Sequence, residues 1–203
     1  MVAQSRLPSQ RFEYTLRQQG YERLAGVDEA GRGCLAGPVV AAAVILAPDV
    51  HLPDLTDSKL LSPAMREKLA RSIRASASGI GVGLCSPQEI DRLNILWAAM
   101  EAMRRAVSNL APEPDYLLID GNRCFPDARQ PFETIVQGDR RCRVIAAASV
   151  IAKVERDRLM HRLHDDYPAY AWKANAGYPT KQHYAALARH GPTPHHRRSF
   201  RLA

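Results

Sequence analysis

The stretch AGVDEAGRGCLAGPVV, residues 25–40, joins two apolar segments through a glycine-rich link. The segments are 23–29 and 38–47, and the second is rich in β-branched residues. This pattern predicts two neighbouring strands connected by a tight, functional turn. Asp28 and Glu29 stand at the end of the first segment, directly before the turn. We therefore expect two adjacent carboxylates at a strand end.

Other short apolar runs also end close to a carboxylate. YLLID (116–120) ends in Asp120, and FETIV (132–136) is followed by QGDRRCR, which contains Asp139. GIGVGLC (79–85) indicates one more strand. A buried strand that ends in an acid is typical of a catalytic group delivered to a sheet edge, so four acids become candidates for one site.

Helical signals separate and follow these strands. Ser62 is a suitable N-cap, with Pro63 at the first helical position. Residues 86–110 begin with a capping box and carry one apolar stripe, which predicts a single long helix with its methionines in the core. Residues 144–167 and 180–191 predict two more helices. The order indicates a mixed α/β domain with hairpin-linked early strands and a helical crossover before the later ones.

Length and composition favour one globular domain, and its charge makes nucleic acid the first partner to consider. The chain has 203 residues, 46% hydrophobic and 24% charged, and a formal net charge of +7. A basic balance attracts polyanions, although many soluble basic proteins bind none. Residues 1–20 are polar and lack a sustained period, so we expect a flexible extension before a domain at 21–203.

The cysteine pattern and the N-terminus favour a soluble cytoplasmic protein. The four cysteines form no CxxC pair, which argues against a zinc site and a disulfide framework. The N-terminus lacks the apolar core of a signal peptide, and no apolar run is long enough to cross a membrane. We expect reduced thiols and no membrane association.

Convergence of the four acids would require a cation, because clustered carboxylates cannot all stay ionised without one. Carboxylate oxygens favour Mg²⁺ or Mn²⁺ over zinc, and two such ions ~4 Å apart suit in-line displacement at phosphorus. The alternative is that each acid is solvated or caps a loop. A small-molecule phosphatase would also explain the acids, but not the basic balance of the chain.

Six motifs occur in an order that resembles bacterial ribonuclease HII: GVDEAGRGCLAGPVVAAAVIL, TDSKLLS, LLIDGN, QGD, AAASVIAKVERDRLM and NAGYPTKQH. The resemblance covers residues 21–200. It implies a ribonuclease H-like fold, with a mixed five-stranded sheet flanked by helices and a C-terminal helical extension. The implied activity is hydrolysis of RNA in RNA/DNA hybrids and incision 5′ of single ribonucleotides in duplex DNA, by two metal ions, giving a 3′-hydroxyl and a 5′-phosphate.

The resemblance also implies roles for individual residues. The acids would bind metal and catalyse, the GRG turn would sense the ribonucleotide 2′-hydroxyl, and a tyrosine would stack on the following deoxyribose. Two lysines would contact phosphates. The acids are Asp28, Glu29, Asp120 and Asp139, and the GRG turn is Gly31, Arg32 and Gly33. The tyrosine is Tyr178, and the two lysines are Lys59 and Lys153.

Other interpretations remain open. Ribonuclease HIII shares the fold, but it carries an extra N-terminal domain and lacks the GRG pattern. A catalytically inactive nucleic-acid-binding module would keep the basic surface and lose an acid, whereas all four acids are present here. His195 and His196 suggest a metal or base, but a structural role fits this basic tail better. The resemblance to ribonuclease HII also implies a monomer.

Overall fold

A five-stranded sheet forms the centre of the computed structural model, which describes residues 8–55 and 61–202. The strand order is β3-β2-β1-β4-β5. β1, β2 and β3 are antiparallel, β4 runs parallel to β1, and β5 runs parallel to β4. The predicted mixed sheet is thus confirmed. The strands are β1 (Leu24–Ala30), β2 (Val39–Leu46), β3 (Ala77–Cys85), β4 (Tyr116–Asp120) and β5 (Phe132–Ile135).

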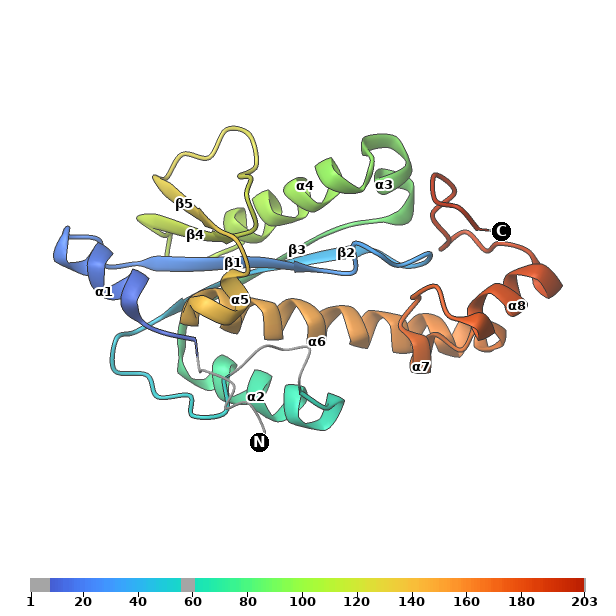
Figure 1. Cartoon of the computed structure of the whole chain (residues 1–203), viewed down its shortest axis with the longest axis horizontal. Coiled ribbons are helices and arrows are strands. Elements are labelled where there is room, and N and C mark those ends of the chain that lie inside the picture. Colours follow the sequence, from blue (N-terminus) through green and yellow to red (C-terminus); the bar gives the residue numbers. More distant parts are fainter. Residues whose placement is uncertain (1–7, 56–60, 203) are drawn as a thin grey trace.

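Helices cover both faces of the sheet (Figure 1). α4 packs on β3 and β2, while α6 crosses β1 and β2 on the opposite face with α2 beside it. Gly26 of β1 permits the contact with α6, because a Cβ there would overlap the main chain of Val144. The helices are α1 (Arg11–Gln18), α2 (Pro63–Ser76), α3 (Pro87–Leu93), α4 (Ile95–Ser108), α5 (Gly138–Arg141), α6 (Arg143–Asp166), α7 (Trp172–Asn175) and α8 (Lys181–His190).

The predicted single helix over 86–110 is wrong, because the chain breaks at Asn94. Asn94 has φ of 64°, and its side chain accepts hydrogen bonds from the amides of Leu96 and Trp97. Asparagine adopts positive φ more often than most residues, and its side chain caps the second helix, α4. The predicted capping box of Ser86 and Glu89 is present at α3. The apolar stripe continues through the break, so periodicity alone cannot reveal it.

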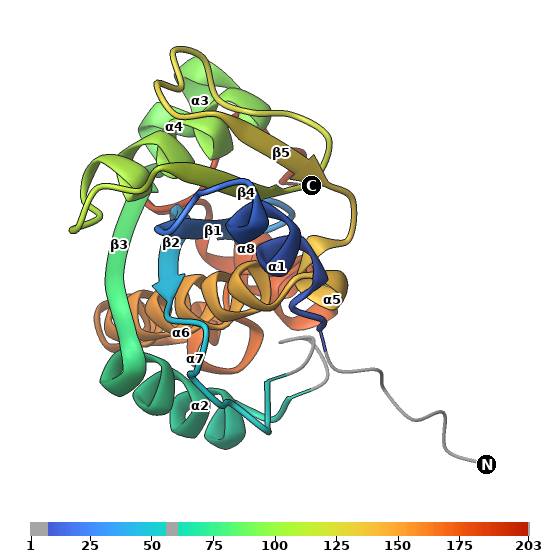
Figure 2. The same ribbon diagram turned by 90° about the vertical axis from the view of Figure 1, so that its left-hand side faces the viewer.

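The N-terminal segment differs from the predicted flexible extension. Residues 11–18 form α1, and Leu16 is buried in the core. Glu13 is also buried, and its carboxylate accepts a hydrogen bond from the amide of Val144 at 3.1 Å. Figure 2 shows α1 against the body of the molecule. This helix is therefore part of the packed domain.

The C-terminal segment forms the expected helical extension at one end of α6 (Figure 1). A 3₁₀ turn over Pro168–Tyr170 is followed by α7 and α8. Aromatic and imidazole rings fill the space between them, including a stacked pair of Tyr170 and Trp172 with centroids 5.2 Å apart. This small core fixes the loop between α7 and α8, which carries Tyr178.

Candidate active site

Asp28 lies on the central strand β1, opposite Ala42 of β2, with 5% of its surface exposed. The main-chain amide of Glu29 donates a hydrogen bond to its Oδ1 at 2.7 Å. Ser149 of α6 forms a second hydrogen bond with the carboxylate. The sheet and the helix below it therefore hold this acid in a fixed orientation.

Asp120 lies beside Asp28 at the same edge of the sheet. Val27 of β1 pairs with Ile119 of the parallel neighbour β4, so the next residue on each strand is an acid. Oδ1 of Asp120 accepts a hydrogen bond of 2.6 Å from the amide of Gly138, which begins α5. Parallel pairing thus places the two carboxylates together.

The charges of three of the acids act on one another. Burial raises the pKa of the Asp28 carboxyl well above its usual range, and the charges of Glu29 and Asp120 raise it further. The pKa of Glu29 is raised chiefly by burial, against the opposing effect of Arg32, whose Nη1 lies 3.1 Å from Glu29 Oε1. A nearby cation would relieve this repulsion.

Asp139 lies on α5 rather than at a strand end. It is buried, with 4% of its surface exposed, and it follows Gly138, whose amide binds Asp120. Val136, Gln137 and Gly138 separate it from the end of β5, and Gln137 adopts the left-handed conformation, with φ of 56°. The structure thereby brings the fourth predicted acid next to a residue bound to the cluster.

The donor set suits a divalent cation. Within residues 8–55 and 61–202, no three acid, histidine or cysteine side chains are already arranged to hold a metal ion. The mutual repulsion of the buried Asp28 and the partly buried Glu29 and Asp120 is nevertheless what a bound cation would offset. Oxygen ligands alone match Mg²⁺ or Mn²⁺. The residues therefore fit the metal that the sequence predicts.

The GRG turn is held from below by Arg197. Its guanidinium donates hydrogen bonds to the carbonyls of Gly31 and Arg32, at 2.7 and 2.9 Å. In a trans peptide the amide points opposite to the carbonyl. The amides of Arg32 and Gly33 therefore point away from Arg197, as a turn that presents donors to a ligand requires.

Tyr178 stands on the neighbouring loop with 40% of its surface exposed. Its hydroxyl hydrogen-bonds to Cys34, which follows the GRG turn, and Arg156 lies 5.9 Å from its ring centroid. The amide of Leu35 donates to the carbonyl of Gly177 at 2.8 Å. The segment that directly follows the GRG turn thus contacts the loop of Tyr178.

Of the two lysines predicted to contact phosphates, the structure describes only Lys153. Lys153 lies on α6 with Nζ 5.9 Å from the Tyr178 ring centroid and 3.2 Å from Asp157 Oδ1. It is therefore a neighbour of the sensing tyrosine. Lys59 lies outside the described residues.

Sequence reasoning missed two buried arginines. Arg156 is 1% exposed and donates to the carbonyls of Ala36, Pro38 and Ala176, while Arg197 is fully buried beneath the GRG turn. Burial and the proximity of Arg156 lower the pKa of Arg197 to about 10, so Arg197 stays cationic at neutral pH. Burial of a charge in the middle of a basic segment has no local sequence signal.

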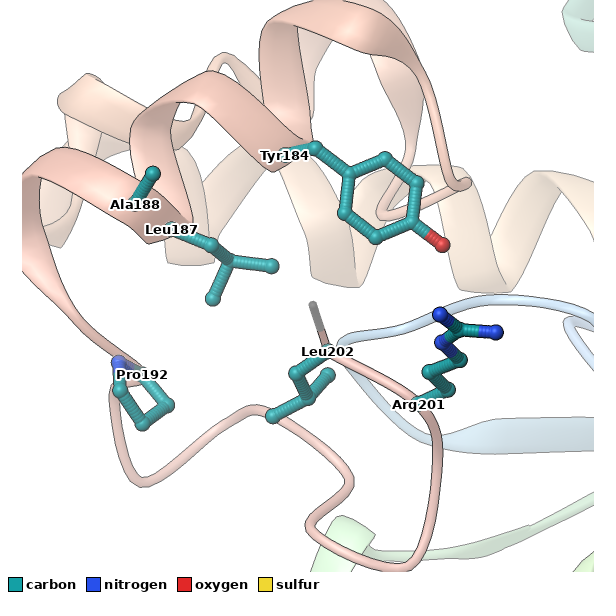
Figure 3. A pocket seen from close by; sticks show the side chains of 6 residues that line it. All are labelled: Tyr184, Leu187, Ala188, Pro192, Arg201 and Leu202. Atoms are coloured by element: carbon teal, nitrogen blue, oxygen red, sulfur yellow. The ribbon is translucent and has the colours of Figure 1, made fainter.

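A hollow of about 700 Å³ lies apart from these residues, between α8 and the C-terminal tail. Figure 3 shows its lining, with Tyr184 and Leu187 from α8 facing Arg201 and Leu202. None of the candidate site residues lines it. It has no carboxylate, so it offers no metal site.

Comparison with known proteins gives consistent matches. The family model for Ribonuclease HII matches residues 25–203. A Ribonuclease HII from Salinibacter ruber is 55% identical over 193 residues, which are 94% of this chain and 96% of that protein. No helix in the described parts of the chain is long and apolar enough to span a membrane.

Solved structures agree with this fold. The ribonuclease H2 of Pyrococcus horikoshii superposes with a TM-score of 0.74 at 28% identity, covering 89% of this chain and 95% of that one. The RNase HII of Archaeoglobus fulgidus, solved in a complex with PCNA, superposes with a TM-score of 0.75 at 28% identity. The match covers 89% of this chain and 96% of that one. The ribonuclease H-like fold is thereby confirmed.

Proposed function

This chain belongs to the ribonuclease HII family, and on that premise we propose that it incises duplex DNA on the 5′ side of a single embedded ribonucleotide. It is a nuclease of the ribonuclease H type, an endoribonuclease that degrades the RNA of RNA/DNA hybrids. In the proposed reaction water attacks the phosphorus 5′ of the ribonucleotide. The P–O3′ bond breaks, leaving a 3′-hydroxyl and a 5′-phosphate.

One observation carries the proposal: the buried acids and the GRG turn are consecutive on the same strand and turn. Asp28 and Glu29 lie on β1, and Gly31 begins the turn directly after it. A phosphate at the acids therefore has its sugar near the turn. Recognition of a ribose and cleavage beside it then require no movement between separate domains.

Asp28, Glu29, Asp120 and Asp139 would hold two divalent ions, Mg²⁺ or Mn²⁺. When bound, the ions polarise the phosphate and lower the pKa of the attacking water. The chain orients this site through three contacts: Ser149 and the Glu29 amide on Asp28, and the Gly138 amide on Asp120. These contacts fix the carboxylates before the substrate arrives.

The sensing turn would select ribose. The amides of Arg32 and Gly33 point away from Arg197, and Gly33 has open space where a Cβ would lie. A main-chain group can then approach a 2′-hydroxyl, which is the group that separates RNA from DNA. Arg32 also binds Glu29 at 3.1 Å, which connects the turn to the acids.

Tyr178 would lie on the sugar that follows the ribonucleotide, where a 2′-hydroxyl would crowd the ring. Its partial exposure and its contacts with Cys34 and Arg156 support a ring that is anchored but accessible. Lys153, next to the ring, and Lys59 would contact substrate phosphates.

The wider setting is also part of the proposal. We place α1 together with residues 21–203 in one catalytic domain of a cytoplasmic monomer whose partner is hybrid or ribonucleotide-containing duplex. The net charge of +7 supports a polyanionic substrate. A purely binding module would not need a buried Asp28 that is repelled by the charge of Asp120.

The test uses two labelled DNA duplexes that differ by one ribonucleotide, with and without Mg²⁺ or Mn²⁺. We expect one incision, 5′ of the ribonucleotide, only with metal, and ligation-competent 3′-hydroxyl ends. Uniform DNA should stay intact. Cleavage of an RNA/DNA hybrid but not of the single-ribonucleotide duplex would reject the finer proposal and leave the family activity in place.

A further inference from the structure

Two buried histidines lie between the loop of Tyr178 and the C-terminal tail. His183 of α8 is fully buried and His196 is 2% exposed. Their Nε2 atoms are 3.1 Å apart. Trp172 Nε1 also donates to His183 Nε2, at 3.1 Å. The pair is thus enclosed, and its hydrogen-bond partners decide where each proton lies.

The partners select one tautomer for each ring. The amide of Thr193 can only donate, and it does so to His196 Nδ1 at 2.9 Å, so His196 carries its proton on Nε2. The carbonyl of Tyr178 can only accept, at 3.0 Å from His183 Nδ1, so His183 carries its proton there. His183 Nε2 then presents its single lone pair to both Trp172 and His196, which share it.

Both rings stay neutral in this arrangement. Burial lowers the pKa of His183, and burial together with His183 lowers the pKa of His196 to about 4. The hydrogen bonds therefore run in one direction, from the Thr193 amide through His196 and His183 to the carbonyl of Tyr178.

The next residue in the tail, Arg197, binds the carbonyls of Gly31 and Arg32. Consecutive residues of one segment are thus linked to both proposed sensors: His196 contacts His183, which binds the Tyr178 carbonyl, and Arg197 binds the GRG turn directly. The mutual placement of the two sensors depends on this segment.

We propose that His183 is a positioning residue for substrate selection: its Nδ1–H, fixed by His196 and Trp172, sets the Tyr178 main chain so that the ring meets the sugar after the ribonucleotide. The inference rests on the proposed function and adds a residue that does not touch substrate. Loss of the contact should shift the preference between substrates rather than the chemistry at the acids.

Two substitutions at His183 separate this contact from the rest of the network. An asparagine places its amide where Nδ1 lies and keeps a donor for Tyr178, whereas a glutamine places its amide where Nε2 lies and loses that donor. The measurement is the single-turnover rate on a single-ribonucleotide duplex divided by that on an all-RNA strand paired with DNA. We expect His183→Gln to lower this ratio about two- to tenfold, the effect of one neutral hydrogen bond, and His183→Asn to keep it.

The effect must act through Tyr178. In a Tyr178→Ala background, His183→Gln should therefore cause no further change in the ratio. At position 196 the order reverses, because glutamine keeps the donor near Nε2 and asparagine does not; His196→Gln should keep the ratio and His196→Asn should lower it. This second pair tests the proposal if the His183 variants fold poorly.

Equal ratios for His183→Asn and His183→Gln, with the position 196 pair also equal, would overturn the inference and leave the histidines a structural role. The inference would also be overturned if His183→Gln lowered the ratio as strongly in the Tyr178→Ala background as it does with the tyrosine present. Failure of the wild-type enzyme to cleave the single-ribonucleotide duplex would instead reject the proposed function, which the same wild-type control reports separately.

Discussion

The side chain of Arg156 occupies the space that a Cβ atom on Gly31 would need. Arg156 is buried and its guanidinium is bound to three main-chain carbonyls, so it has no room to withdraw. Gly31 also has φ of +95°, which side chains rarely adopt. Glycine at the first position of the GRG turn is therefore required by the fold.

Gly31→Ala should lower the free energy of unfolding by about 1–3 kcal/mol from backbone strain alone. The overlap with Arg156 adds to this loss. Urea denaturation measures this loss. Gly33→Ala is the matched control, since a Cβ there has open space within the protein. It should fold normally and lose ribonucleotide cleavage through crowding of the substrate. Equal stability of both variants would contradict the role of Arg156.

Asp120→Asn should nearly abolish metal-dependent cleavage while the fold is retained. The amide oxygen can still accept from Gly138, but it replaces a charged metal ligand. In metal-free buffer the variant should melt higher than wild type, because one charge that raises the pKa of Asp28 is gone. Asp165→Asn, at an exposed position of α6, should change neither property. A cleavage rate of Asp120→Asn equal to that of wild type would contradict the assignment of Asp120 to the site.

Stability should also depend on pH through Asp28. Its pKa is raised in the folded state, so its contribution is fully present below the unfolded value of about 4 and is lost as pH rises through the folded value. In metal-free buffer, wild type should lose melting temperature relative to Asp28→Asn as pH rises from about 4. Added Mg²⁺ should oppose this loss in wild type. A difference between the proteins that is constant with pH would argue against a buried, repelled carboxylate.

The sheet and the acid pair follow from sequence because their signals are local. Apolar runs end at Asp28 and Asp120, and the parallel register of β1 and β4 brings those ends together. The break at Asn94 could not be predicted, since one residue with positive φ interrupts a stripe that continues on both sides. The backbone conformation of this one residue, rather than the apolar periodicity, determines where the first helix ends.

The buried arginines and histidines escape prediction for a different reason. Arg156 meets the carbonyl of Ala36 and Arg197 meets that of Gly31, and 120 and 166 residues separate the partners in sequence. A charge that is satisfied by main-chain carbonyls leaves no complementary acid to search for. Only the tertiary arrangement shows that these residues support the sensing turn.

Binding to duplex should weaken steeply with salt, because lysines and arginines displace condensed counterions from phosphates. Even three neutralised phosphates would give about a fortyfold loss between 50 and 200 mM salt. The Asp120→Asn protein allows binding to be measured by anisotropy without cleavage. Lys153→Ala should reduce the slope by about one contact, whereas Arg129→Ala, exposed in the loop before β5, should leave it unchanged. Affinity indifferent to salt would contradict a basic docking surface.

Tyr178→Ala should lose at least about tenfold in cleavage of the single-ribonucleotide duplex, since stacking of an aromatic ring contributes roughly 1–3 kcal/mol by analogy with bases. The all-RNA hybrid should be affected less, because a 2′-hydroxyl on the following sugar already crowds the ring. The acids lie on β1, β4 and α5, so metal binding should survive, as a metal-induced rise in melting temperature can show.

The contacts of Tyr178 provide two controls for that experiment. Tyr178→Phe keeps the ring and loses only the hydrogen bond with Cys34, so it should retain most of the substrate preference. Tyr184, exposed to a similar degree on α8, lines the apolar hollow instead, so Tyr184→Ala should behave as wild type. Because a ribose is demanded at the GRG turn and disfavoured at Tyr178, loss of the ring should relax only the second requirement. A Tyr178→Ala enzyme with the wild-type ratio between the two substrates would place selection of the following sugar elsewhere.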